Sequence, residues 1–160
     1  MASKAKATNI MFLQLEYTYK NAQLPAVLKA YQDKMLSSRK GVTIQPLLVS
    51  ENRLEFAVSR AMPLFAQRFF NLNSFEYTEV ANINTQEKTI EISSQQKIAS
   101  VTLKFTMVLF FDEESRSTKA TALVKIENVP KILKKTVDTY SRLQFMNERD
   151  LEMVHLEKKY

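Results

Sequence analysis

Glycine is almost absent from this chain. There is one among 160 residues, where an average composition would supply roughly eleven. Phosphate-binding loops and dinucleotide fingerprints need two or three glycines at fixed spacing, because only a residue without a Cβ lets the backbone approach phosphate closely. Gly41 stands alone, so the sequence excludes both motifs.

Cysteine is missing altogether, which excludes disulfides, thiolate metal sites and cysteine nucleophiles. The single histidine, His155, cannot build a multi-histidine metal site and is a poor candidate for a catalytic triad. We therefore expect no metal site and no cofactor. The longest apolar run, Met107–Phe111, is far shorter than the ~20 residues that a membrane-spanning helix needs.

The charge is positive, with 23 basic and 17 acidic side chains and a formal net charge of +6. Residues 1–8 are interpreted as a flexible basic tail before a single domain at residues 9–160. The basic excess favours contact with an anionic membrane surface or phosphate groups, and it is equally compatible with a charge that serves only solubility. Nucleic-acid binding is not expected, because no aromatic-basic strand signature or helix-turn-helix spacing is present.

The first half of the chain predicts one strand, one helix and a hairpin. Alternating apolar and polar residues over Phe12–Tyr19 predict a strand with one wet face. Helical spacing follows from Leu24 to Met35, and we expect Gly41 to end that helix as a left-handed cap. Val42–Val49 and Arg53–Ser59 then predict a hairpin.

The second half predicts four more strands between two helices. Pro63–Asn71 is expected to be a short helix. The strands are expected at Ser74–Ile83, Lys88–Lys97, Ala99–Phe111 and Thr118–Glu127, and one long helix at Pro130–Lys158 with Asn128 as its N-cap. The apolar stripe expected on this helix comprises Ile132, Leu133, Val137, Tyr140, Leu143 and Met146.

This order predicts an α+β fold of the helix-grip type, in which an antiparallel sheet of about seven strands wraps around the long C-terminal helix. A sheet with one apolar face must cover that face, and the terminal helix is the only element long enough to do so. Either an apolar cavity or a filled core could lie between the two layers.

One segment is specific enough to suggest a family. Met62–Phe70, which reads Met-Pro-Leu-Phe-Ala-Gln-Arg-Phe-Phe, resembles the lid-helix pattern Met-Pro-x-x-Ala-x-Arg-x-Phe of the PRELI-like family. Ile83–Glu91 is similar to that family's strand–turn–strand, and Leu151–Val154 to a pattern on its last helix. The element order matches over about residues 10–157, with the motifs concentrated in Met62–Ser93.

The resemblance implies a phospholipid carrier of the mitochondrial intermembrane space that pairs with a small cysteine-rich helical protein. Enzymatic activity is not expected, because no pair of acidic side chains is singled out as catalytic. The resemblance also implies a mobile lid over the entrance to the lipid cavity. The lid residues would be Met62, Pro63, Phe65, Ala66, Arg68, Phe69 and Phe70. Core packing is the alternative role for the aromatic rings among them.

Cationic side chains that could contact a phosphate or a membrane are Lys29, Arg39, Lys40, Lys131, Lys134 and Lys135. The chain departs from the family at a Tyr-Pro-Asn-Pro stretch, which here reads Ala30-Tyr31-Gln32-Asp33-Lys34, and Met146 stands where the family has a lysine. Because a buried phosphate without cationic partners is costly to desolvate, a second hypothesis is a structural or interaction subunit of a larger mitochondrial membrane complex.

Overall fold

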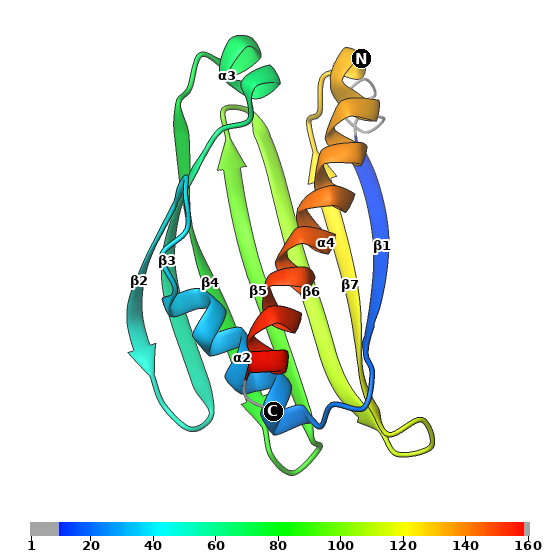
Figure 1. Cartoon of the computed structure of the whole chain (residues 1–160). Coiled ribbons are helices and arrows are strands. Elements are labelled where there is room, and N and C mark those ends of the chain that lie inside the picture. The colour runs from blue at the N-terminus through cyan, green and yellow to red at the C-terminus, as the bar shows by residue number, and fades with distance from the viewer. Residues whose placement is uncertain (1–9, 159–160) are drawn as a thin grey trace.

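The computed structural model describes residues 10–158, which form one antiparallel sheet with helices on its concave side (Figure 1). The strands are β1 (Ile10–Tyr19), β2 (Val42–Val49), β3 (Arg53–Ala61), β4 (Ser74–Asn84), β5 (Thr89–Ile98), β6 (Val101–Asp112) and β7 (Ser117–Glu127). The helices are α2 (Leu24–Leu36), α3 (Leu64–Phe70) and α4 (Lys134–Lys158), and a 3₁₀ turn, η1 (Lys131–Leu133), leads into α4. The basic tail predicted for residues 1–8 lies outside the described residues.

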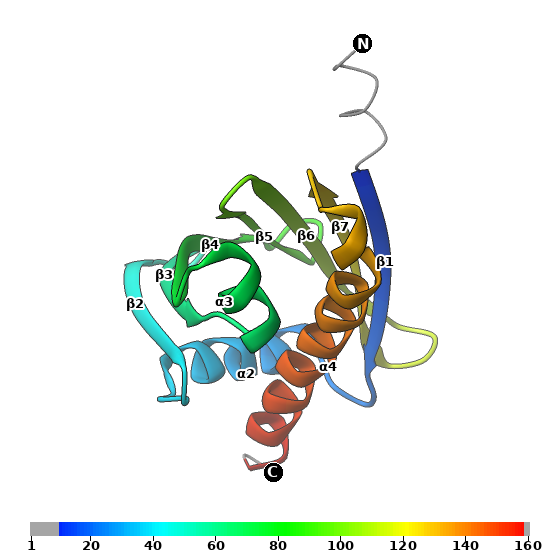
Figure 2. The same ribbon diagram turned by 90° about the horizontal axis from the view of Figure 1, so that it is seen from above.

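The sheet confirms the predicted fold class, with seven strands and a long terminal helix among residues 10–158. The strand order is β1-β7-β6-β5-β4-β3-β2, and every neighbouring pair is antiparallel. The first two strands therefore lie at opposite edges, connected by α2. Viewed from above, the sheet curves around α2 and α4 (Figure 2).

The core fills much of the space between the concave face and the two longer helices. In β1, Leu13, Leu15 and Tyr19 are buried while Phe12 is exposed, so the predicted alternation is confirmed. Buried and more exposed side chains also alternate along β3 to β7. Each fully buried large aliphatic or aromatic side chain contributes about 1.5–3 kcal/mol.

The end of α2 differs from the sequence prediction. Gly41 does not cap the helix, which ends at Leu36. The hydroxyl of Ser37 donates a hydrogen bond to the carbonyl of Asp33 at 2.7 Å and satisfies one of the open carbonyls there. Gly41, with φ +76°, instead forms the turn before β2, where its carbonyl accepts a hydrogen bond from the Ala61 amide at 2.8 Å.

The start of the last helix also needs a correction. Asn128 is not its N-cap: it has a left-handed φ of 64°, and its side-chain amide donates to the carbonyl of Ser100. Of the predicted apolar stripe, Ile132, Leu143 and Met146 are exposed. The prediction was wrong for these three residues, because α4 follows the η1 turn and packs on the sheet with a different face, which contains Phe145 and Arg149.

Turns without glycine connect the later strands. Lys88, Ala99 and Arg116 each adopt a φ between 53° and 57° in the connections β4–β5, β5–β6 and β6–β7. The left-handed conformation costs an ordinary L-residue roughly 1–2 kcal/mol. The hydrogen bonds between the strands that flank each turn must offset this cost. No helix within residues 10–158 is long and apolar enough to cross a membrane.

Candidate functional site

A cavity of about 100 Å³ lies between the concave face of the sheet and α4. One wall is apolar and comes from the sheet. Its residues include Leu15, Phe75, Ile92, Leu103, Phe105, Met107 and Val124. The opposite side and one end are polar, because α2, α4, β3 and β4 direct charged side chains inward. The space is therefore neither the purely apolar cavity nor the filled core that the sequence left open.

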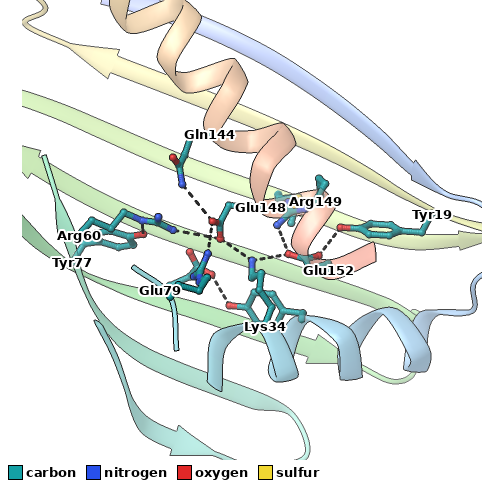
Figure 3. A network of polar contacts seen from close by, with 12 residues as sticks. Tyr19, Lys34, Arg60, Tyr77, Glu79, Gln144, Glu148, Arg149 and Glu152 are labelled. Carbon is teal, nitrogen blue, oxygen red and sulfur yellow. Dashed lines mark hydrogen bonds and ion pairs between the residues drawn. The ribbon is translucent and has the colours of Figure 1, made fainter. Parts of the chain in front are cut away.

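Glu148 on α4 is the centre of the polar end (Figure 3). Its Oε1 lies 3.0 Å from Nζ of Lys34 and 3.4 Å from Nη2 of Arg60. Its Oε2 accepts a hydrogen bond from Nη1 of Arg39 at 2.6 Å. One carboxylate thus joins cations from α2, from the segment after α2 and from β3.

Glu152, one helical turn further along α4, is buried beside it (Figure 3). Its Oε1 accepts a hydrogen bond from the Tyr19 hydroxyl at 2.6 Å, and its Oε2 accepts one from Lys34 Nζ at 2.7 Å. The same Oε2 accepts a hydrogen bond from Arg149 Nη2. Lys34 bridges the two glutamates, so α2 is fastened to the C-terminal half of α4.

Two tyrosines extend the cluster onto the sheet. The Tyr77 hydroxyl accepts a hydrogen bond from Arg60 Nε at 2.7 Å, and Tyr31 donates one to Glu79 Oε2 at the same distance. All four side chains line the cavity. The cluster therefore forms a polar surface on the cavity rather than a sealed core contact.

The ion pairs hold both glutamates in the charged state. Burial alone raises the pKa of Glu148, but Lys34 and Arg60 outweigh it and hold that pKa well below its usual range. The pKa of Glu152 is lowered by the same balance, in which Arg149 and Lys34 oppose the effect of burial. Both carboxylates are therefore anions at neutral pH.

The tyrosines shift in the opposite direction. Burial, followed by the nearby carboxylate of Glu79, raises the pKa of Tyr31 and of Tyr77 well above 10. Burial also raises the pKa of Tyr19. These hydroxyls remain neutral across the physiological range, where Tyr19 and Tyr31 donate hydrogen bonds and Tyr77 accepts one from Arg60.

Arg149 is the incompletely satisfied member of the cluster that lines the cavity; Arg39, which does not line it, also has two unpaired nitrogens. Its side chain is 3% exposed, and its Nε has no hydrogen-bond partner among the described residues. Its Nη1 reaches only the thioether sulfur of Met107, a weak acceptor, at 3.0 Å. Glu152 and the ring of Phe145, 5.1 Å from the guanidinium carbon, compensate part of its burial, but a buried donor without an acceptor is still unfavourable.

The predicted lid segment forms α3 and the residues before it. Met62 and Ala66 are buried at its base, whereas Phe69 is 49% exposed and Arg68 is exposed. Phe65, half-buried, packs edge-to-face on Tyr140 of α4 with ring centroids 5.9 Å apart. Pro63 stands at the N-cap, and Phe70 is half-buried against Phe69. The segment thus combines packing and exposed residues.

The predicted cations do not form one continuous rim. Lys29 is exposed and pairs with Asp33 at 3.2 Å, and Arg39 is engaged by Glu148. Lys40 is exposed. The remaining three residues, Lys131, Lys134 and Lys135, lie at the start of α4, next to α3 and away from α2 (Figure 1). About 20 Å of helix separates Lys134 from Glu148.

Sequence reasoning missed most of the polar cluster, although a signal exists on α4. Phe145, Arg149, Glu152 and Leu156 recur at spacings of four, three and four residues and are all buried. A basic and an acidic side chain between two apolar ones on one helical face indicate a buried ion pair. The partners from β1, α2 and β3 could not be assigned without the tertiary fold.

No protein-family model and no curated protein sequence matches the chain. Solved structures do match its fold. The di-domain aromatase/cyclase StfQ of the steffimycin biosynthetic pathway has a TM-score of 0.63 at 11% identity, over 98% of this chain and 54% of that one. The ZhuI aromatase/cyclase from Streptomyces sp. R1128 has a TM-score of 0.61 at 7% identity, over 94% and 95%.

Human STARD10 is a third structural neighbour, with a TM-score of 0.58 at 10% identity over 92% of this chain and 63% of that one. At these identities the similarity shows the fold alone. The chain therefore has a helix-grip fold, as predicted. Membership of the PRELI-like family in particular stays a prediction.

Proposed function

We propose that this protein is a lipid-binding domain that holds an amphipathic ligand between its sheet and α4 and acts without catalysis. The observation that carries the proposal is the cavity, which combines an apolar sheet wall with a charged end. A concave, mostly apolar space with a few convergent polar groups is the usual form of a small-molecule site. The helix-grip neighbours, one of them STARD10, support a ligand-binding role for this space.

The α3 end provides a surface that fits contact with a membrane. Leu64, Phe69 and Ile132 are exposed there, and Arg68 and Lys131 are exposed on the same elements. Interfacial segments combine apolar side chains with basic ones in this way, because the former enter the acyl boundary and the latter contact anionic headgroups. The predicted lid would then meet the membrane from which the ligand comes.

The ionisation of the site favours binding over acid–base catalysis. Efficient proton transfer needs a group with a pKa near the working pH. Among the described residues, each shift in pKa moves its group away from neutrality: the pKa of Glu148 and of Glu152 is lowered, and that of Tyr31, Tyr77 and Arg149 is raised. The two glutamates and Arg149 therefore stay charged and the tyrosines stay neutral, and none of them is set to exchange protons near pH 7.

The size of the cavity bears on the ligand. Its volume of about 100 Å³ lies below the roughly 300–1,000 Å³ of common ligand pockets. A two-chain phospholipid would therefore require α3 or α4 to move outward. Phospholipid transfer, a mitochondrial location and a small helical partner remain predictions from the resemblance.

Native mass spectrometry of gently purified protein tests the proposal. We expect one lipid per chain, and transfer of lipid between liposomes. Ser94, which is buried and lines the cavity, offers a blocking variant, Ser94→Phe. Its neighbour Gln95 is exposed, so Gln95→Phe is the matched control. Protein that is always empty and transfers no lipid would contradict the proposal, as would equal loading of the two variants.

An interaction subunit is the second candidate, favoured by the outer face of α4. Leu143, Met146 and Val154 are exposed at spacings of three and eight residues, which places them on one side of the helix. Such a subunit would migrate with a large membrane complex on native gels. Recovery of the protein only as a small species would contradict this candidate.

A further inference from the structure

The cavity contains a buried group that its own protein surroundings leave incomplete. Arg149 lines the cavity, and its Nε lacks a hydrogen-bond partner among residues 10–158. Its Nη1 has only the sulfur of Met107. Arg39 also has unpaired nitrogens, but it does not line the cavity. Nε is itself fully buried, so an acceptor in the cavity would reach it only with a small shift of the surrounding side chains.

The charge of the cluster indicates the sign of that acceptor. Within the described part of the chain the cluster holds four cationic and three carboxylate side chains, which leaves one positive charge unmatched. The seven are Lys34, Arg39, Arg60 and Arg149, with Glu79, Glu148 and Glu152. A buried charge is stable when it is paired and hydrogen-bonded. A ligand with a single negative charge would make the cluster neutral, whereas a phosphate monoester would exceed this charge.

The remaining walls indicate the body of the ligand. Leu103, Phe105 and Val124 line the cavity from β6 and β7 and present apolar surface. The volume of about 100 Å³ holds only the head and first few carbons of one chain, so the rest of a longer chain would displace α3 or α4 outward. The charged end lies beside α2 and the C-terminal half of α4, so the chain would run along the sheet toward α3 (Figure 1).

We infer that the cavity binds a single-chain carboxylic acid of the medium-chain fatty acid class, with its carboxylate on the unpaired nitrogen of Arg149. This inference rests on the proposed function and narrows its ligand. A carboxylate is a planar acceptor that suits guanidinium donors, and charge-assisted hydrogen bonds of this kind are about twice as strong as neutral ones. Arg60 and Lys34 line the same end and add to the positive potential there.

Isothermal titration with four probes tests this inference. Sodium decanoate should bind with one molecule per chain. Decan-1-ol, with the same chain and no charge, should bind about tenfold more weakly or worse. Sodium acetate, which has the charge and no chain, should show no binding at the same concentration. Didecanoyl phosphatidic acid reports whether two chains are accepted.

Variants separate the role of Arg149 from folding. Arg149→Met combined with Glu152→Gln removes the guanidinium together with its carboxylate partner, so no single buried charge is stranded. We expect it to lose about tenfold or more in decanoate affinity while decan-1-ol binding stays within twofold or so. Arg142→Met is the matched control, because Arg142 is half-exposed on the same helix and pairs with Asp138. It should bind both probes like the unchanged protein.

The outcomes distinguish this inference from the proposed function. Equal affinity for decanoate and decan-1-ol, or unchanged decanoate affinity in the double variant, would overturn the role of Arg149. Binding of phosphatidic acid without decanoate would overturn the single-chain acid while lipid binding stands. If none of the amphiphiles binds to the folded protein, the proposed function falls as well.

Discussion

Glu148 shows how one side chain organises the interior of this protein. It is 13% exposed, yet three cations from different parts of the chain converge on its two oxygens. Removing one member of a buried ion pair is more damaging than the pair itself is stabilising, because the partners remain desolvated without compensation. Without the carboxylate of Glu148, the burial of Lys34 and Arg60 would be unfavourable.

Glu148→Gln should therefore destabilise the protein by about 3 kcal/mol or more. The amide keeps the shape but leaves three cations without their shared anion. Urea unfolding of the variant measures the loss. Asp138→Asn on the same helix is the control: Asp138 forms an exposed pair with Arg142 and should cost less than about 0.5 kcal/mol. Equal, small losses in the two variants would show that the cluster does not hold the fold.

Helix α3 has a packed face and an exposed face. Ala66 is buried and Phe65 rests on Tyr140, which ties the helix to the start of α4. Phe69 is half-exposed and touches its neighbour Phe70, with ring centroids 5.1 Å apart. Exposure thus separates Phe65, which packs, from Phe69, which is available for the proposed membrane contact.

Phe69→Ala should lower binding to vesicles of phosphatidylcholine and phosphatidic acid by about tenfold, since it removes exposed apolar area from the proposed contact surface. Its effect on unfolding should stay below about 1 kcal/mol, because a half-exposed ring leaves little cavity. Co-sedimentation with vesicles measures the first effect and urea unfolding the second. Leu36→Ala is the control, because Leu36 is an exposed apolar residue at the end of α2 and not part of α3. Vesicle binding that falls equally in both variants would contradict a specific role for α3.

Alternation and helical spacing predict the elements well, since they follow from which face of each strand or helix is buried. The seven strands and the three helices within residues 10–158 lie where these patterns place them, to within a few residues. The polar cluster was not predicted, because Tyr19, Lys34 and Arg60 are charged or polar residues whose partner lies more than 80 residues away in sequence. No local pattern records such a pairing. The role of Gly41 was misassigned for a similar reason, since its hydrogen bond to Ala61 belongs to the sheet rather than to α2.

At the scale of the whole molecule, the cluster joins both helices to the sheet and makes stability depend on pH. The pKa values of Glu148 and Glu152 are lower in the folded protein than in the unfolded chain. Their contribution is therefore complete above the ordinary glutamate pKa of about 4.3 and is lost as the pH falls toward the folded values. Protonation of the unfolded chain drives this loss.

Urea unfolding between pH 3 and 8 should thus show a stability that is nearly constant above about pH 5 and decreases steeply below about pH 4.3. The slope from the two glutamates together reaches about 2.7 kcal/mol per pH unit. Glu148→Gln should reduce that slope by about half, because one of the two titrating groups is gone. A slope that is unchanged in the variant would refute the assignment to Glu148.

The glycine-poor turns have a consequence for how the chain folds. A turn that holds Lys88, Ala99 or Arg116 in a left-handed conformation is unfavourable by itself and cannot start a hairpin early. Assembly must instead depend on ladders between strands, including the pairing of β1 with β7, whose partners Ile10 and Glu127 are 117 residues apart in sequence. Closing such long loops before the contacts form is slow. Folding of this protein should therefore be a late and cooperative event, with few local structures that persist before the core is made.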